Sequence, residues 1–185
     1  SLLDERGVET PITVVPTGVD VDRFAAGDGA RVRAERGIPA SATVIGHVGR
    51  LAPEKNLDFL TDAIRRVIAD RDEAHWLVVG DGPSAAAIRE AFGADPDLAN
   101  RLHMTGRLTG EDLVDAYHAM DVFAFASTSE TQGMVVAEAM AAGLPVVALD
   151  ASGVREVVRD RETGRLVGDE DGERLAAVLG EVVDA

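Results

Sequence analysis

The sequence predicts a doubly wound, Rossmann-like α/β fold, in which helices cover both faces of a parallel sheet. Short β-branched runs alternate along the chain with amphipathic stretches of helical period, as in successive strand–helix–strand units. The runs are near-continuously apolar, as expected where a strand is buried on both faces. We expect the strands at residues 43–48, 76–79, 102–105, 122–126 and 146–149.

Helix signals lie between these strands. Asn56 is placed to cap a helix whose apolar residues recur on one face, and Thr109 precedes a second stretch of the same kind. A third helix is expected over residues 134–142, because Gly143 and Pro145 follow it in the order typical of a helix C-terminus. These helices supply the crossovers that a parallel sheet requires.

Two segments of unequal size are expected. Residues 1–25 combine a polar start, a strand-like stretch at 12–15 and a loop, and we interpret them as a hinge or remnant of a preceding domain. Residues 26–185 carry the α/β pattern and form the predicted Rossmann-like domain. The first residues show neither a Met nor a leader pattern, which favours a piece of a longer protein.

Charge and composition exclude several classes of protein. With 33 acidic against 18 basic residues and a net charge of −15, the chain lacks the broad basic surface of a general nucleic-acid binder. Cysteine is absent, which removes disulfides and thiolate zinc sites and fits a reducing compartment. No apolar run approaches the roughly 20 residues of a bilayer span. We expect a cytoplasmic protein, with peripheral contact to the cytoplasmic membrane face left open. The acidic surface is compatible with adaptation to high salt or with a coding bias toward arginine.

One local feature departs from this acidic character. Lys55 is the single lysine of the chain, and it follows Gly49 and Arg50 at the mouth of a predicted strand-to-helix crossover. Two cations beside a glycine and before a helix start are suited to bind a phosphate. We therefore predict that these three residues bind a phosphorylated ligand. In an open α/β sheet such a ligand lies beyond the carboxyl ends of the strands.

A second group of candidates surrounds the helix expected at 134–142. Glu138 is the only charged residue of this helix, and a carboxylate in apolar surroundings needs hydrogen-bond partners. The functional interpretation is that it accepts hydrogen bonds from two ribose hydroxyls. The structural alternative is that it pairs with an Arg or caps a neighbouring backbone group. Glu130 lies in the polar loop before the helix, where a solvated loop acid is the alternative. The first-turn N–H groups that suit a diphosphate belong to Gly133, Met134 and Val135.

Residues 130–148 resemble the E-x7-E segment of retaining glycosyltransferases of family 4, with Glu130 and Glu138 as its two acidic residues. These enzymes have the GT-B architecture of two Rossmann-like domains. Further motifs similar to those of the family lie at residues 15–20 with Phe24, 49–56, 79–83, 153–156 and 163–167. The match spans nearly the whole chain and is specific in combination. The chain thus resembles the C-terminal, donor-binding domain of such an enzyme.

The resemblance implies a role for each candidate. Arg50 and Lys55 would neutralise the donor diphosphate and its leaving group. Glu138 would hold the ribose hydroxyls, and Glu130 would contact the sugar. The expected catalytic residues are therefore Arg50, Lys55 and Glu130, and no metal cofactor is expected.

The resemblance also implies the kind of donor and acceptor. Backbone groups at Arg107 and Leu108 would meet the base, whose identity their side chains do not encode. A UDP-sugar is favoured over a GDP-sugar, with retaining transfer of a hexose to an acceptor sugar or glycolipid. The acceptor site would belong to an N-terminal domain that is missing here, so we expect no transfer by this chain alone.

Other functions are open as alternatives. A GT-B nucleotide-sugar epimerase or a non-catalytic nucleotide-binding module would share the fold. Residues 80–85 match the dinucleotide fingerprint of a nicotinamide-dependent oxidoreductase, but they follow the second strand rather than the first. That interpretation would also leave Lys55, Glu130 and Glu138 without roles. The Asp-x-Asp pairs are expected by chance in so acidic a chain, and we expect none to bind a metal. A further hypothesis is that His47 approaches the diphosphate, because it lies two residues before Gly49 of the predicted phosphate loop.

Overall fold

Six parallel strands form one sheet in the computed structural model, which describes residues 5–8, 10–13, 15, 17–168 and 170–185. The strands lie in the order β3-β2-β1-β4-β5-β6, and every neighbouring pair is parallel. The strand order changes direction between β1 and β4, which makes this the switch point of the sheet. The bounds are β1 Thr43–Val48, β2 Ala74–Val79, β3 Leu102–Gly106, β4 Val122–Phe125, β5 Val146–Leu149 and β6 Arg165–Val167.

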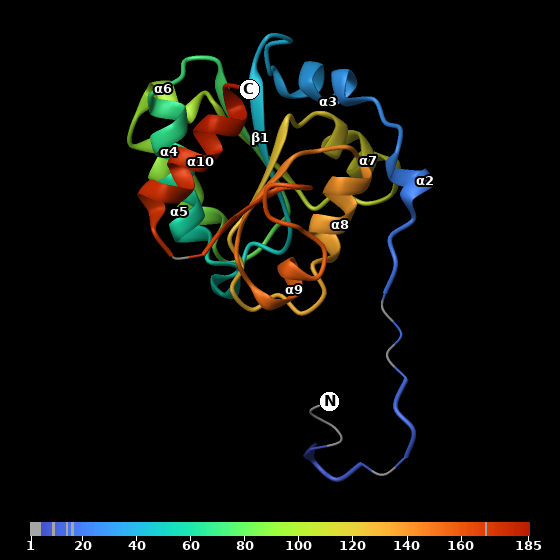
Figure 1. The fold of residues 1–185 in the computed structure, drawn as a ribbon. Helices are drawn as coiled ribbons and strands as arrows, with labels where there is room; N and C mark the ends of the chain where they lie inside the picture. The colour runs from blue at the N-terminus through green and yellow to red at the C-terminus, as the bar shows by residue number, and fades with distance from the viewer. Residues whose placement is uncertain (1–4, 9, 14, 16, 169) are drawn as a thin grey trace.

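Helices cover both faces of the sheet, so the predicted doubly wound arrangement is confirmed (Figure 1). One face carries α2 Val21–Phe24, α3 Gly29–Arg36, α7 Gly110–His118, α8 Met134–Ala141 and α9 Ser152–Arg155. The other carries α4 Leu57–Ala69, α5 Ala85–Gly93, α6 Pro96–Ala99 and α10 Gly172–Val183, while the 3-10 turn η1 Pro53–Lys55 follows β1. In the described part of the chain, none of these helices has the length and apolar character to cross a bilayer.

All five predicted strands are present. β1 and β5 have the predicted bounds, and the other three differ by one or two residues at one end. β6 is an addition that the sequence pattern did not predict. It has three residues, begins with the charged Arg165 and lies at the edge of the sheet, so it shows no sustained apolar run.

The structure corrects both predicted helix caps. Asn56 occupies the N-cap position of α4, but its backbone is left-handed with φ 53°, and its side chain makes no capping hydrogen bond. Its carbonyl oxygen accepts the N–H of Leu60 at 3.1 Å, which is the first hydrogen bond of the helix. Thr109 occupies the N-cap position of α7, again without a side-chain cap. The residue before a helix was thus predicted correctly, but the hydrogen bond was wrong.

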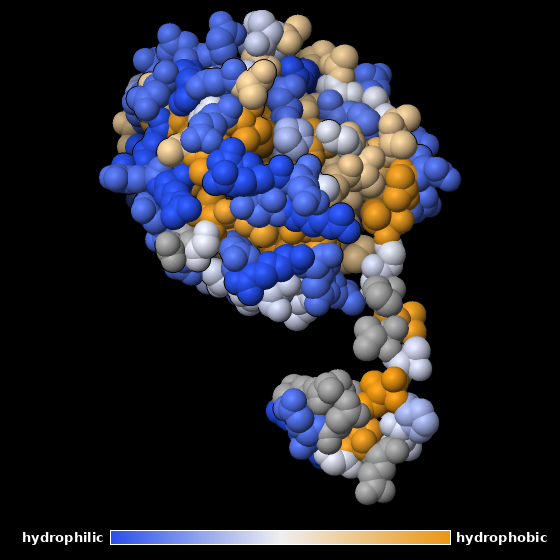
Figure 2. Space-filling view, in the orientation of Figure 1, coloured by the Kyte–Doolittle hydropathy of each residue, from blue (hydrophilic) through white to orange (hydrophobic). Residues whose placement is uncertain are grey.

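The described residues before α2 lie away from the sheet (Figure 1), and among them Val8 and Val15 are exposed, with apolar residues coloured orange in Figure 2. The strand-like assignment of 12–15 is wrong for Ile12, Thr13 and Val15, and Val14 lies outside the described residues. Phe24, by contrast, is 4% exposed and belongs to the core. The domain division at residue 25 stays a prediction.

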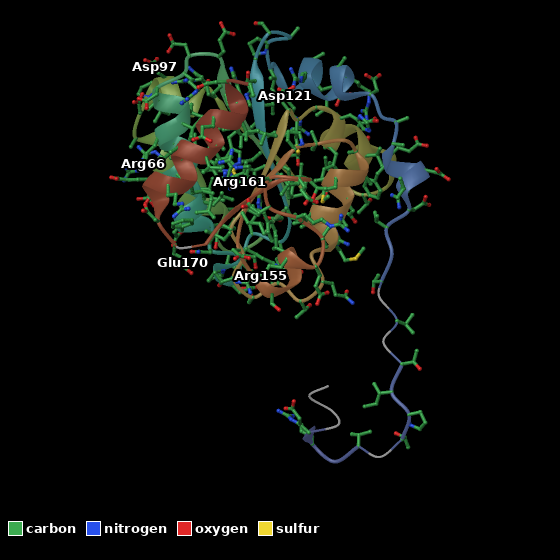
Figure 3. The ribbon with its side chains drawn as sticks, viewed as in Figure 1. Arg66, Asp97, Asp121, Arg155, Arg161 and Glu170 are labelled. Carbon is green, nitrogen blue, oxygen red and sulfur yellow. The ribbon has the colours of Figure 1, made fainter. Side chains whose placement is uncertain are left out.

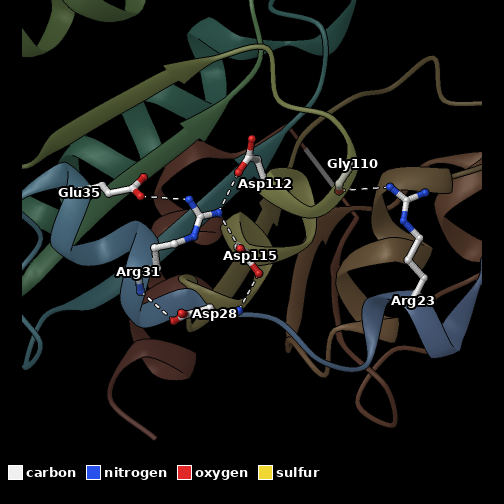
Figure 4. Close-up of polar contacts among 7 residues, drawn as sticks. All are labelled: Arg23, Asp28, Arg31, Glu35, Gly110, Asp112 and Asp115. Atoms are coloured by element: carbon white, nitrogen blue, oxygen red, sulfur yellow. Dashed lines mark hydrogen bonds and ion pairs between the residues drawn. The ribbon is translucent and has the colours of Figure 1, made fainter.

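Arg31 joins α3 to α7 through a network of acidic side chains (Figure 4). Its guanidinium group donates to Asp112 at 2.8 Å, to Asp115 at 2.6 Å and to Glu35 at 3.0 Å. Asp115 also accepts the backbone N–H of Asp28 at 2.6 Å. This network therefore ties α3 to α7.

Further ion pairs lie at the surface, among them Arg50–Glu54, Arg66–Glu173 and Arg159–Glu162. Exposed ion pairs contribute about 0–1 kcal/mol each, so burial of the two apolar clusters is the main stabilising contribution. The charged residues labelled in Figure 3 are all exposed and are Arg66, Asp97, Asp121, Arg155, Arg161 and Glu170.

His47, His75 and His103 lie in strands β1, β2 and β3. His47 of β1 is fully buried, and its Nδ1 lies 3.2 Å from the Ala124 carbonyl oxygen, which places the proton on Nδ1. Burial lowers the pKa of His47 to about 4. His75 Nδ1 lies 2.9 Å from His103 Nε2, and burial lowers the pKa of both groups, that of His103 to about 4.

Acidification from pH 7 to pH 5 is expected to destabilise this fold. The buried histidines stay neutral in the folded state but protonate near pH 6.5 in the unfolded state. The unfolded state therefore binds more protons between pH 6.5 and 4, and stability falls as the pH falls through this window. His47 alone contributes a loss of roughly 2 kcal/mol between pH 7 and 5. Urea unfolding at the two pH values measures it, and His47→Gln should reduce the difference. An undiminished difference would contradict the assignment to His47.

Candidate functional site

A cavity of about 720 Å³ opens at the carboxyl ends of β1, β2 and β3. Its walls come from the segments directly after β1, β2 and β3, together with α7 and α8. Open α/β sheets bind their ligands at this position. The lining residues are Val48, Gly49, Arg50, Val79, Gly80, Asp81, Gly82, Arg107, Leu108, Leu113, Val135 and Glu138.

The cavity brings together six of the ten predicted site residues, namely Gly49, Arg50, Arg107, Leu108, Val135 and Glu138. The other four do not line it, and they are Lys55, Glu130, Gly133 and Met134. They belong to η1, to the loop after β4 and to the start of α8. The candidate site therefore has two parts that share α8.

The rest of the wall was not among the predicted site residues, although residues 79–83 belong to a motif that the sequence analysis noted. Val48, Val79 and residues 80–82 lie at or just after the ends of β1 and β2. Their position at the carboxyl end of parallel strands was the available signal. Leu113 carried no such signal, because an apolar residue at helical spacing looks like a core residue.

Gly80 and Gly82 are required by the packing of two loops. A Cβ on Gly80 would lie 1.8 Å from the carbonyl oxygen of Gly49, and one on Gly82 would lie 2.3 Å from that of Leu51. The Leu51 N–H also donates to the Asp81 carbonyl oxygen at 3.0 Å. The loop after β2 thus lies directly on the loop after β1, which accounts for these glycines without a dinucleotide.

Lys55 and Glu130 form a partly buried ion pair. Nζ donates to Oε2 at 2.8 Å, and the two side chains are 22% and 15% exposed. Burial raises the pKa of Glu130, but the hydrogen bond and charge of Lys55 and the backbone N–H groups of Gly133 and Gln132 outweigh it, so the pKa lies below its usual value. An ammonium group has three N–H donors, and within the described residues Nζ makes this one hydrogen bond, so two donors are available for a further anion.

The loop that carries Glu130 is held by close backbone contacts. Gly133 at the N-cap of α8 is left-handed with φ 63°, and a Cβ there would lie 2.7 Å from the Gly153 carbonyl oxygen. The N–H of Gly153 donates to the Glu130 carbonyl oxygen at 3.1 Å. Ser129 Oγ donates to the Glu54 carbonyl oxygen at 3.2 Å, which joins the loop to η1.

Glu138 lies on α8 and borders the cavity. Its Oε2 accepts a hydrogen bond of 2.8 Å from the hydroxyl of Tyr117 on α7. Burial and the charge of Glu138 raise the pKa of Tyr117, so the hydroxyl keeps its proton. Among the described residues, the side-chain partner of Glu138 is Tyr117, and no arginine forms an ion pair with Glu138.

Arg50 and His47 flank Gly49 in different environments. The Arg50 side chain is 71% exposed, and its Nη1 lies 3.6 Å from Glu54 Oε1. His47 Nε2 lies 3.6 Å from the position of a Cβ on Gly49, but the residue is fully buried and does not line the cavity. Its approach to a diphosphate stays a prediction.

A metal site is not evident in the part of the chain that the structure describes, where no three His, Cys, Asp or Glu side chains are suitably grouped. The expectation of a donor bound without metal stays a prediction.

The sequence matches the family described as glycosyl transferases group 1 over residues 42–184. The chain therefore belongs to this family of glycosyltransferases, as the resemblance predicted. One curated relative is a D-inositol 3-phosphate glycosyltransferase of Geodermatophilus obscurus, which is 37% identical over 98% of this chain and 42% of the relative. Another is a GDP-mannose-dependent alpha-mannosyltransferase of Mycobacterium tuberculosis, which is 39% identical over 81% of this chain and 36% of the relative. The chain thus spans about two fifths of the length of these relatives.

Solved structures share the fold. The crystal structure of Anabaena HepE in complex with UDP and glucose superposes with a TM-score of 0.79 at 28% identity, covering 93% of this chain and 47% of that one. The C-terminal domain of a glycosyl transferase group 1 family protein, LpcC, from Francisella tularensis gives 0.78 at 23% identity, covering 91% and 89%. The predicted fold class, a Rossmann-like half of a GT-B glycosyltransferase, is confirmed.

Replacing Lys55 by Met should raise the pKa of Glu130. The ammonium group lowers the pKa of the Glu130 carboxyl group by its hydrogen bond and its charge, and without it the effect of burial, which raises this pKa, is opposed only by the backbone N–H groups. A carbon-13 NMR titration of the Glu130 carboxyl group measures the change. Arg50→Met is the matched control, because this nearby cation pairs with Glu54 and should leave the titration in place. An unchanged pKa in Lys55→Met would disprove the coupling.

Gly133→Ala should destabilise the protein more than Gly143→Ala. Both glycines are left-handed, with φ 63° and 82°, and this conformation costs a residue with a Cβ about 1–2 kcal/mol. Only at Gly133 would the Cβ also meet backbone, whereas nothing lies within 4 Å at Gly143. Urea unfolding should show a loss of about 1 kcal/mol for Gly143→Ala and at least about twice that for Gly133→Ala. Equal losses would mean that α9 does not constrain the loop.

Proposed function

We propose that this chain is the donor-binding domain of a retaining glycosyltransferase of family 4, which transfers a hexose from a nucleotide diphosphate sugar. The observation that carries the proposal is the cavity at the carboxyl ends of β1, β2 and β3, with Glu138 on its wall and the Lys55–Glu130 pair beside the start of the same helix. Membership of the glycosyl transferases group 1 family supports the class of reaction.

The cavity is the proposed site of the nucleoside. Val48 and Val79 give it an apolar wall that suits a base, and backbone groups at Arg107 and Leu108 suit the polar edge of that base. Ribose hydroxyls are hydrogen-bond donors, and the carboxylate of Glu138 is the acceptor that we assign to them.

The diphosphate is assigned to the space next to Arg50 and Lys55. Fixed cations at this position stabilise the negative charge that develops on the leaving diphosphate, which is electrostatic catalysis. Glu130 holds Lys55 in place and contacts the transferred sugar in this proposal. Further donors are the first-turn N–H groups of α8, from Gly133, Met134 and Val135.

A UDP-sugar is the proposed donor, in preference to a GDP-sugar. The structure of HepE with UDP and glucose supports the first, and the GDP-mannose-dependent relative supports the second. We propose that the acceptor, a sugar or glycolipid, is bound by a separate N-terminal domain, that no metal takes part, and that the enzyme works in the cytoplasm or at the cytoplasmic membrane face.

Calorimetric titration with UDP, GDP, ADP and NAD tests this proposal. We expect UDP to bind, and we expect Arg50→Ala and Lys55→Ala each to weaken it about ten- to hundredfold, because each removes a charged hydrogen bond. Arg66→Ala is the matched control, since Arg66 is an exposed arginine of α4 far along the helix from the site. Binding of NAD alone, or of none of the four, would contradict the proposal.

A further inference from the structure

Tyr117 is a core residue whose single polar atom reaches the candidate site. Its side chain is fully buried on the face of the sheet covered by α7 and α8. The ring of Phe24 meets it edge-on at 5.6 Å, and the ring of Phe123 lies 6.0 Å away. Aromatic contacts on two sides fix the plane of the ring and therefore the position of its hydroxyl.

The hydroxyl has one proton, and the geometry shows where it is donated. Its oxygen lies 2.8 Å from Glu138 Oε2 and 3.3 Å from the Val135 carbonyl oxygen. The shorter contact is the charge-assisted one, because an ionised carboxylate is a stronger acceptor than a neutral carbonyl group. Tyr117 therefore holds one carboxylate oxygen of Glu138, which lines the cavity, and makes no hydrogen bond to the other, Oε1.

We propose that Tyr117 is a positioning residue of the donor site, whose hydroxyl holds the Glu138 carboxylate so that it distinguishes a ribose from a deoxyribose. This inference rests on the proposed role of Glu138 as acceptor for the ribose hydroxyls. A free glutamate loses the rotamer freedom of a long side chain when it binds a ligand, whereas a carboxylate that is already held loses less. The discrimination between sugars is thus determined in part by a residue that does not line the cavity.

Tyr117→Phe removes the hydroxyl and keeps the ring, so it tests the proposal directly. Calorimetric titrations with UDP, 2′-deoxy-UDP and 3′-deoxy-UDP compare the variant with the wild-type chain. We expect UDP to bind about three- to tenfold more weakly to Tyr117→Phe, while at least one deoxy analogue changes little. The ratio of the affinities for UDP and that analogue should therefore fall.

Two further variants separate positioning from general loss of packing. Phe123→Leu loosens the same aromatic cluster but keeps the hydroxyl, so it should lower the thermal stability and preserve the preference for UDP. Glu138→Gln should lose most of the preference, because it replaces the charged acceptor. Equal loss of preference in Phe123→Leu and Tyr117→Phe would overturn the role of the hydroxyl.

The outcomes also separate this inference from the proposed function. If Glu138→Gln loses the preference and Tyr117→Phe keeps it in full, Glu138 binds the ribose but Tyr117 does not position it. If the wild-type chain binds UDP and both deoxy analogues equally well, or binds none of them, the proposed role of Glu138 is wrong, and the positioning role is overturned with it.

Discussion

The position of β1 in the middle of the sheet is the constraint on which the site depends. β1 pairs with β2 along its whole length and with β4 on its other side. The absence of a side chain at Gly46 lets Met120 pack closely on β1, because a Cβ on Gly46 would lie 2.0 Å from Met120 Sδ. The loops after β1 and β4 therefore begin side by side at the same edge of the sheet. This neighbourhood brings Lys55 to within 2.8 Å of Glu130, although 75 residues separate them in the chain.

The fold could be predicted from the sequence where the physical signal is local. Apolar runs of four to six residues between amphipathic stretches identified the five strands that form most of the sheet. β6 could not be predicted, because three residues at an edge need little apolar character. The cap at Asn56 failed for a local reason. The backbone of Asn56 is left-handed, with φ 53°, and in that conformation its side chain makes no capping hydrogen bond to the first turn of α4.

The candidate residues were evident from the sequence, but their partners were not. A partly buried carboxylate needs hydrogen bonds whether or not a ligand is present. The structure supplies Lys55 for Glu130 and Tyr117 for Glu138, and each partner lies on a different element from the acid it contacts. No spacing rule predicts such pairs, because they depend on how the helices and loops pack. Tyr117 looked like any other apolar position of α7, and only the direction of its hydroxyl gives it a further contact.

The acidic composition of the chain does not oppose a local phosphate site. At physiological salt, charges more than about 8 Å apart are largely screened, so the net charge of −15 acts weakly across the width of the domain. Groups within hydrogen-bond distance decide the local electrostatics. Glu130 neutralises Lys55 at close range, which offsets the desolvation cost of a partly buried ammonium group. This ion pair uses one of the three N–H donors of the ammonium group. Arg50, 71% exposed, adds a second cation at the surface. In the proposed phosphate site, one lysine within hydrogen-bond distance can therefore provide the positive charge that a broad basic patch would otherwise provide.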